Sequence, residues 1–233
     1  YKRQTQLNFH VNNQLSLAVT DNGLALPQYD VEVKGKYTAA SVEPTYAWEF
    51  RNATGSATVY DMVSGVAATP VGGASSSTAG MVFSGGGNVV NVGTIAALGG
   101  SDFTIEFYAS ISTGLITPSY QRFFNSDSIF LWENNGTNFI FNDGNGTFVD
   151  SALVDSTSYP VDTFRHYVLC YYNSTATGEL YINTVPSNSL SNASTILTSS
   201  ANITNFRIGN VTATNETFVG TISYFRIWQD TAL

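Results

Sequence analysis

The most informative stretch of the chain begins with FRHYVLCYY at Phe164–Tyr172 and GELYIN at Gly178–Asn183, separated by a polar turn. It continues with FRIG at Phe206–Gly209 and FVGTISYFRIW at Phe218–Trp228. Each run is rich in aromatic and β-branched residues and is bounded by Asn, Ser, Thr and Gly, the pattern of antiparallel strands with tight connections. The C-terminal part of the chain is therefore predicted to be β-sheet.

The same pattern extends toward the N-terminus. FTIEFYASI at Phe103–Ile111 alternates apolar and polar residues, as a strand with one buried face does. Ile129–Trp132, Phe139–Phe141 and Thr147–Val149 are predicted as shorter strands, separated by Asn-Gly and Asp-Gly sequences that favour hairpin turns. Residues 64–80, rich in Gly, Ala and Ser, are predicted as a loop. Many short antiparallel strands predict an all-β sandwich or barrel.

Residues 1–44 differ from the rest of the chain. They contain one clearly alternating strand at Leu7–Val11 and further candidates at Leu15–Val19 and Tyr29–Val33. We therefore divide the chain into an extended N-terminal β segment, residues 1–44, and a domain at residues 45–233. Extended segments need partners for their backbone groups, so we expect the first segment to pair with its own sandwich or, by strand addition, with a neighbouring subunit.

Composition limits the partners of this chain. Only 11% of residues are charged, against roughly 25% in an average globular protein, and the formal net charge is −8. A surface of this charge repels phosphate, so we predict no nucleic-acid partner, and anionic membranes are disfavoured as well. No apolar run approaches the length of a membrane span, and we predict no membrane insertion. A surface made of Ser, Thr, Asn and Gly favours an extracellular setting, at a cell surface or on a virion.

Cysteine and histidine are scarce. Cys170 is the single cysteine, so no intramolecular disulfide forms, and it is predicted to be a small buried apolar side chain. With only His10 and His166, a histidine-rich metal site is excluded.

The order of these motifs from Tyr46 onward resembles the laminin G-like branch of the concanavalin A-like lectin/glucanase superfamily. Tyr108 and Phe164 stand where the family pattern has Trp, and Thr184 stands where it has Gly. The resemblance implies a two-sheet antiparallel jelly-roll sandwich. It also implies that His166 has a structural role, as a core residue or as one that forms hydrogen bonds in the sheet. The motifs that carry it are AWEF at 47–50, Asp61, GMVFSGG at 80–86, SDFTIEF at 101–107, FRHY at 164–167, GELYIN at 178–183 and the two closing runs.

Hydrolases of the superfamily use a strand with closely spaced acids, in the sense Glu-x-Asp-x-x-Glu. Two carboxylates on one strand face can flank a glycosidic bond as nucleophile and acid. Here Glu106, Glu133, Asp143, Asp150 and Glu179 each stand alone on their strands or turns. We therefore predict that the chain is not an enzyme.

The resemblance also implies a calcium ion near a loop rim, and calcium is the one cofactor that the sequence indicates. Asn142, Asp143 and Asn145 form an oxygen-rich cluster that is compact enough to contribute ligands. The same residues also suit a hairpin turn, and the sequence favours the turn.

Glycan binding requires aromatic platforms together with hydrogen-bonding groups. Tyr120, Trp132 and Tyr159 lie near predicted loops and are the candidates for this role.

The chain also contains Asn-x-Ser/Thr sequons, most of them in predicted turns where an attached glycan would be solvated. A polar surface that is never glycosylated remains the alternative. The sequons are at Asn52, Asn135, Asn145, Asn173, Asn192, Asn202, Asn210 and Asn215.

Missing catalytic acids, low charge and sequons together favour a non-catalytic extracellular glycoprotein. Our leading hypothesis is a structural or adhesive building block of a surface layer, filament or virion that associates with itself or with other surface proteins. The alternative is a carbohydrate-binding lectin domain with glycan partners. A glycoside hydrolase is the third and least favoured hypothesis.

Overall fold

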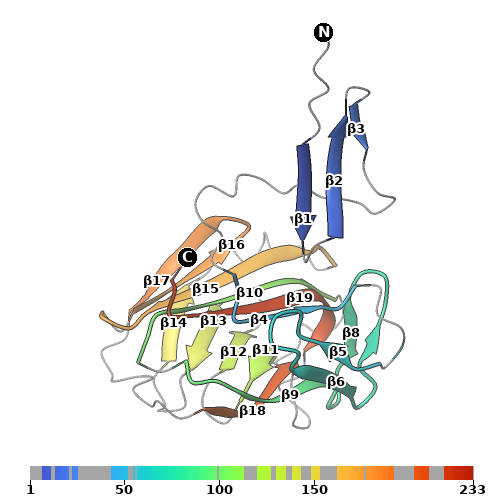
Figure 1. Cartoon of the computed structure of the whole chain (residues 1–233). Coiled ribbons are helices and arrows are strands. Elements are labelled where there is room, and N and C mark those ends of the chain that lie inside the picture. Colours follow the sequence, from blue (N-terminus) through green and yellow to red (C-terminus); the bar gives the residue numbers. More distant parts are fainter. Residues whose placement is uncertain are drawn as a thin grey trace. The chain divides into compact units, whose positions relative to one another are not determined.

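A computed structural model shows the chain to be all-β, with no helix in the part that it describes (Figure 1). The backbone is described for residues 7–11, 14–20, 23–25, 43–51, 55, 57–98, 100–112, 120–126, 130–134, 138–142, 148–152, 162–175, 177–191, 202–209 and 218–232. Side chains are described for residues 43–51, 55, 57–98, 100–112, 122–126, 162–175, 177–184, 202–209 and 218–232. The chain divides into two compact units, Tyr1–Ser41 and Val42–Leu233.

The first unit contains a three-stranded antiparallel sheet, ordered β1-β2-β3. The predicted strand at Leu7–Val11 is observed with these bounds, and the candidate at Leu15–Val19 lies within the second strand. The candidate at Tyr29–Val33 lies outside the described residues. The predicted division into residues 1–44 and 45–233, and the pairing of the first segment with a subunit or its own sandwich, stay predictions. The strands are β1 (Leu7–Val11), β2 (Gln14–Thr20) and β3 (Gly23–Ala25).

The second unit is a sandwich of two antiparallel sheets. In the first sheet the order is β17-β16-β15-β10-β19-β8-β7, and β4 also pairs with β19. Its strands are β4 (Tyr46–Glu49), β7 (Ser75–Ser76), β8 (Met81–Ser84), β10 (Phe103–Ile111), β15 (Arg165–Tyr172), β16 (Thr177–Ile182), β17 (Val185–Ser191) and β19 (Val219–Gln229).

In the second sheet the order is β14-β13-β12-β11-β18-β9-β6-β5. Strands from distant parts of the sequence are neighbours, as where β18 lies between β11 and β9. This arrangement is the predicted jelly-roll sandwich. Its strands are β5 (Val59–Tyr60), β6 (Ala67–Val71), β9 (Val89–Ile95), β11 (Tyr120–Asn125), β12 (Phe130–Asn134), β13 (Asn138–Asn142), β14 (Phe148–Ala152) and β18 (Ile203–Gly209).

The core lies between the sheets and is dominated by aromatic rings. Phe107 of β10 is fully buried near its centre, with its ring centroid 4.9 Å from that of Tyr167, 5.0 Å from Phe123 and 5.7 Å from Phe225. Successive residues of a strand point to opposite faces, so each strand contributes alternate side chains to this core. The apolar face predicted for Phe103–Ile111 is the buried face.

The prediction of a loop at residues 64–80 is wrong, because β6 and β7 lie within it. The sequence here lacks large apolar side chains, and Ala68 and Pro70 fill the buried positions of β6 instead. Pro70 lies beyond the two-residue pairing of β6 with β5, so its missing amide hydrogen is not needed on that side. Small residues at the edge of a sheet gave no periodic signal. The prediction for Cys170, by contrast, is confirmed: it is free and buried.

Candidate functional site

The outer face of the second sheet carries a line of polar side chains opposite the core. Val90, Phe206 and Phe124 are buried against the core. Their neighbours along the strands, Asn91, Arg207 and Asn125, therefore lie on the other face. Asn91 is exposed, Arg207 is half-buried and Asn125 is only 9% exposed.

Strand register places these residues side by side. Arg207 in β18 is paired with Asn91 in β9 on one side and with Asn125 in β11 on the other. Thr69 in β6 is paired with Asn91, which extends the line by one strand. We call Thr69, Asn91, Arg207 and Asn125 the polar row. Because neighbouring strands lie about 4.8 Å apart, the row is about 14 Å long.

Three members of the polar row have no polar partner among the described residues. The side chains of Asn91, Arg207 and Asn125 form no hydrogen bond or ion pair with any side chain or backbone group that the structure describes. Other arginines differ: Arg51 is 2.7 Å from a carboxylate oxygen of Glu49, for example. Asn125 is not among the described residues whose polar side-chain atoms are buried without a partner, so its amide reaches solvent and can bond a ligand.

Three residues that the sequence analysis singled out lie in strands of this sheet. They are the glycan-binding candidates Tyr120 and Trp132 and the calcium candidate Asn142. From Asn125 the same cross-strand line continues through Phe130 in β12 to Asn142 in β13. Trp132 is paired with Arg122 of β11 and lies two residues along β12 from Phe130. Tyr120 is the first residue of β11.

The other predicted ligand residues lie outside the described part of the chain. These are Tyr159, Asp143 and Asn145. The described residues contain no cluster of three or more His, Cys, Asp or Glu side chains that would hold a metal ion. The calcium site stays a prediction.

The outer face of the first sheet has a different character, because its polar groups bind one another. Glu106 of β10 is 12% exposed, and its Oε1 lies 2.7 Å from His166 Nε2. The hydroxyl of Tyr224 donates to the same oxygen at 3.1 Å, and Arg226 Nη1 donates to Oε2 at 3.5 Å. Burial alone would raise the pKa of Glu106, but the His166 hydrogen bond and the charges of Arg226 and His166 hold that pKa below its ordinary value.

Aromatic rings stack along this network. The ring of Phe164 is stacked on Tyr108 at 5.1 Å, and Tyr108 is stacked on Tyr224 at 6.0 Å. The guanidinium of Arg226 lies 4.4 Å from the centroid of the Tyr224 ring. The Tyr108–Tyr224 stack ties β10 to β19, whereas the cation–π contact lies within β19.

A second acid on this face, Glu179, also accepts hydrogen bonds from its neighbours. Glu179 Oε2 accepts hydrogen bonds from Tyr172 at 3.3 Å and from Tyr181 at 2.5 Å. The Glu179 hydrogen bond, together with burial, raises the pKa of Tyr181 to about 12. Burial and the neighbouring Cys170 and Glu179 raise the pKa of Tyr172. Glu106 and Glu179 therefore form hydrogen bonds within the sheet. His166 takes part in them, in agreement with its predicted structural role.

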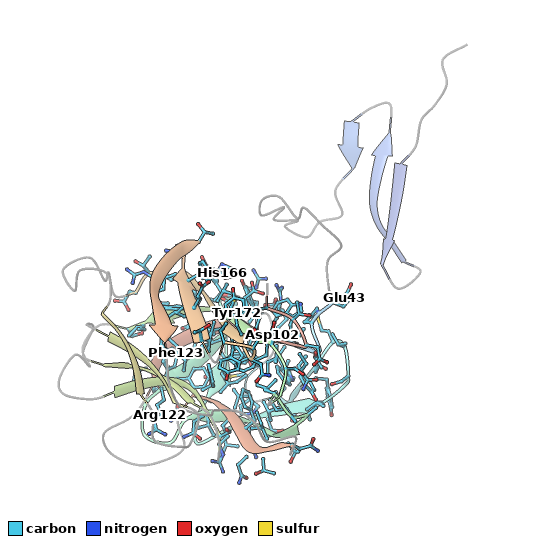
Figure 2. All side chains as sticks on the ribbon, turned by 90° about the vertical axis from the view of Figure 1, so that its left-hand side faces the viewer. Glu43, Asp102, Arg122, Phe123, His166 and Tyr172 are labelled. Atoms are coloured by element: carbon cyan, nitrogen blue, oxygen red, sulfur yellow. The ribbon has the colours of Figure 1, made fainter. Side chains whose placement is uncertain are left out.

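The two outer faces lie on opposite sides of the sandwich. Figure 2 shows Phe123 within the body of the domain, with His166 and Arg122 toward opposite sides of it. Of the two faces, the one with the polar row presents unpaired groups.

The model of the concanavalin A-like lectin/glucanases superfamily matches residues 84–233, which is more than half of the chain. The chain belongs to this superfamily. The resemblance deduced from the motifs is thereby confirmed. A search of curated proteins found no match.

Several solved structures are similar to this chain at low sequence identity. Trypanosoma rangeli sialidase in complex with 2,3-difluorosialic acid is 13% identical, with a TM-score of 0.58 over 83% of this chain and 32% of the sialidase. The binding domain of botulinum neurotoxin serotype D is 15% identical, with a TM-score of 0.56 over 82% of this chain and 48% of that domain. The chain thus spans less than half of each, and the likeness shows the fold alone.

Two of the sequons lie among the described residues. Asn202 is exposed, whereas Asn173 is half-buried and its side-chain amide donates to the Gly100 carbonyl at 3.2 Å. The other sequons lie outside the described residues: Asn52, Asn135, Asn145, Asn192, Asn210 and Asn215.

The sequence analysis did not identify Asn91, Arg207 and Asn125 as site residues. Each adjoins core residues of its strand, in VNV, FRI and FFN, so alternation alone places it on the outer face. No sequence signal shows that the three residues are neighbours, because their strands come from separate parts of the chain.

Proposed function

We propose that this chain is a non-catalytic carbohydrate-binding domain that holds a saccharide on the polar row. The observation that carries the proposal is the unpaired state of Asn91, Arg207 and Asn125, three adjacent polar side chains on neighbouring strands. Polar side chains that form no bond within the protein are free to bond the hydroxyl and carboxylate groups of a ligand. Membership of a superfamily named for lectins and glucanases supports the same function.

The chemistry of the row fits sugar hydroxyl and carboxylate groups. The Asn91 and Asn125 amides each offer a donor and an acceptor, as a pair of vicinal hydroxyls requires. The guanidinium of Arg207 offers a planar fork of donors that matches a carboxylate. We therefore expect an acidic sugar to bind more tightly than a neutral one. The T. rangeli sialidase was solved with a sialic acid derivative, but a likeness of this level concerns the fold, and the proposal rests on the polar row.

This proposal reverses the order of our sequence hypotheses. The building-block hypothesis, for a surface layer, filament or virion, has no support beyond composition, whereas the carbohydrate-binding alternative has a candidate site. An extracellular location and glycosylation of the sequons remain part of the proposal. Their support is the low charge and the exposed position of Asn202.

The non-catalytic part of the proposal is supported by the state of the described acids. A glycosidase needs two carboxylates that are available for proton transfer and attack, on either side of a sugar. Glu106 and Glu179 instead accept hydrogen bonds from His166, Tyr224, Tyr172 and Tyr181.

A glycan array probed with the purified chain tests the function. We expect binding to saccharides that bear a carboxylate, and a loss of about tenfold or more in affinity for Arg207→Ala, since a charge-assisted hydrogen bond is worth about 1.5–3 kcal/mol. Arg51→Ala is the matched control, because Arg51 is an arginine already paired with Glu49. No binding to any saccharide, or equal losses for the two variants, would contradict the proposal.

A further inference from the structure

The turn between β5 and β6 presents apolar side chains to solvent. Tyr60 is 65% exposed, Met62 66% and Val63 51%. Apart from Val71 at the far end of β6, no other large hydrophobic side chain among the described residues is so exposed. We call Tyr60, Met62 and Val63 the apolar turn. It follows β5, the last strand of the second sheet, at one edge of the sandwich (Figure 1).

A buried acid holds this turn in shape. Asp61 is 3% exposed, and its carboxylate accepts hydrogen bonds from the amide of Ala47 in β4 and from the amide and hydroxyl of Ser64. The carboxylate therefore ties the turn to the first sheet. The exposed side chains are carried on a rigid support.

Backbone hydrogen bonds close the turn from within. The amide of Met62 donates to Ala47 at 2.9 Å, that of Asp61 to Val66 at 2.8 Å and that of Gly65 to Asp61 at 3.0 Å. With Ser64 bound to the Asp61 carboxylate, four amides of the turn are satisfied inside the chain. Backbone amides without hydrogen-bond partners are the main obstacle to placing irregular backbone in an apolar medium. These four amides of the turn have partners within the chain, so they do not present that obstacle.

The surrounding sequence carries almost no charge. Between Arg51 and Asp102, Asp61 is the only charged residue of the chain, and it is buried. The turn can therefore approach an apolar phase without removing any neighbouring charge in this segment from water.

We propose that the apolar turn inserts into the interfacial layer of a lipid bilayer whose headgroups carry no net charge. Tyrosine is suited to this layer because its ring is apolar and its hydroxyl remains hydrated, and Met62 and Val63 supply apolar area that reaches below it.

Size distinguishes this partner from a protein surface. A stable protein interface buries about 800 Å² on each side, and three side chains on a narrow turn supply much less. A bilayer deforms around a small projection, so no matching pocket is needed. The net charge of −8 opposes anionic lipids, which directs the proposal to phosphatidylcholine-like surfaces.

The proposal differs from our sequence-based prediction of no membrane insertion. That prediction rested on the absence of a spanning segment and on the negative charge. The described residues include no helix that is long and apolar enough to cross a membrane. A shallow turn does not span the bilayer, and the local segment is uncharged, so neither reason applies to it.

A fluorescence experiment on the full chain tests the insertion. Met62→Cys is labelled with an environment-sensitive dye and titrated with phosphatidylcholine vesicles, while the buried Cys170 stays unlabelled. Ser174→Cys, at an exposed turn of the first sheet, is the control. We expect a blue shift for the dye at position 62 and none at position 174. No shift at position 62, or equal shifts at both positions, would overturn the proposal.

Vesicle flotation of unlabelled variants provides a matched comparison. Val63→Ser should weaken binding by about tenfold, the effect of losing one buried valine. Val71→Ser makes the same change at a similarly exposed valine outside the turn and should leave binding unchanged. Equal effects of the two variants, or binding only to anionic vesicles, would refute the insertion. Self-association without lipid that Val63→Ser abolishes would assign the turn to a second copy of the chain instead.

Discussion

Asn125 and Arg207 are paired across β11 and β18, and neither side chain has a hydrogen-bond or ion-pair partner among the described residues. Asn125 is only 9% exposed. Its amide is not among the described side-chain groups that are buried without a partner, so it reaches solvent and is available to a ligand. Mutations of this pair therefore test ligand binding, and their effect on stability tests whether either side chain has a structural role.

Asn125→Leu should abolish saccharide binding while changing stability little. Leucine keeps the branched shape of asparagine but is larger, and it replaces an amide that reaches solvent, so we expect a change within about 1 kcal/mol in the free energy of unfolding. Urea denaturation measures the stability and the glycan array measures the loss of binding. Asn91→Leu, at an exposed position of the same row, should leave stability within about 0.5 kcal/mol. A large loss of stability on Asn125→Leu would show that the amide has a structural partner.

Glu106 should make the folded state sensitive to acid. Its pKa is lower in the folded protein, so its contribution to stability is complete above the ordinary value of 4.5 and is lost as the pH falls through the folded value. Glu106→Gln should be less stable at neutral pH by about 1–2 kcal/mol and should lose less stability on acidification. Urea midpoints from neutral pH to below 4.5 measure both effects.

Glu49→Gln is the control for this experiment. Glu49 is paired with Arg51 at the surface, where a salt bridge contributes little, so the change should be below about 0.5 kcal/mol. If Glu106→Gln and the unsubstituted chain showed the same dependence on pH, the proposed role of Glu106 would be wrong.

Tyr181 should be among the last tyrosines to ionise. The Glu179 hydrogen bond and burial raise its pKa from 10.0 to about 12, so the stability that it contributes is complete below pH 10.0 and is lost as the pH rises toward about 12. Glu179→Gln should move this ionisation back toward 10.0 in an ultraviolet absorbance titration. Tyr181→Phe should remove this ionisation from the titration and so identify it as that of Tyr181. A titration that Glu179→Gln leaves unaltered would exclude Glu179 as the cause.

Gly220→Ala should damage the pairing of β10 with β19. A Cβ atom at Gly220 would lie 2.0 Å from the carbonyl oxygen of Ser110, so the two strands would have to separate. We expect a loss of about 3 kcal/mol or more in thermal or urea unfolding. Gly86→Ala is the matched control: its φ is +59° but nothing lies within 4 Å, so only a backbone penalty of about 1 kcal/mol is expected. Equal losses would mean that the strand contact is not limiting.

Glycosylation should distinguish the two described sequons. In a glycosylating secretory host, Asn202 should be occupied more fully than Asn173, because Asn202 is exposed and the Asn173 amide is engaged with Gly100. Glycopeptide mass spectrometry measures the occupancy of each. Asn202→Gln should remove one glycan without changing stability. Full occupancy of Asn173 with none at Asn202 would contradict this expectation.

Much of the fold was predictable because strand alternation is local. FTIEFYASI predicted both the bounds of β10 and its apolar core face, although Thr104 and Ser110 on the other face are buried as well. The prediction failed at β6, where Ala68 and Pro70 occupy buried positions that elsewhere hold large apolar residues. Short strands near the edge of a sheet depend on their neighbours more than on their own composition.

The candidate site was less predictable for the same reason. The sequence indicated Trp132, Tyr120 and Asn142 by residue type, and the register relates them to the second sheet. It did not indicate Arg207, since an arginine between Phe206 and Ile208 is an ordinary outward-facing residue of a strand. Arg207 is distinguished only by its lack of a polar partner among the described residues. That property depends on the side chains that surround it in the folded chain.

Local sequence was sufficient for the β class, the superfamily and the outward position of Asn91, Arg207 and Asn125, since the period of two in a strand is a property of each strand alone. Their adjacency was decided by tertiary structure, because the order β11-β18-β9 joins strands from three distant parts of the chain. The exposure of the apolar turn was decided in the same way, by Asp61 reaching across to Ala47 of another strand. Pairing between strands is set by non-local hydrogen bonds and core packing, and no short stretch of sequence contains that information.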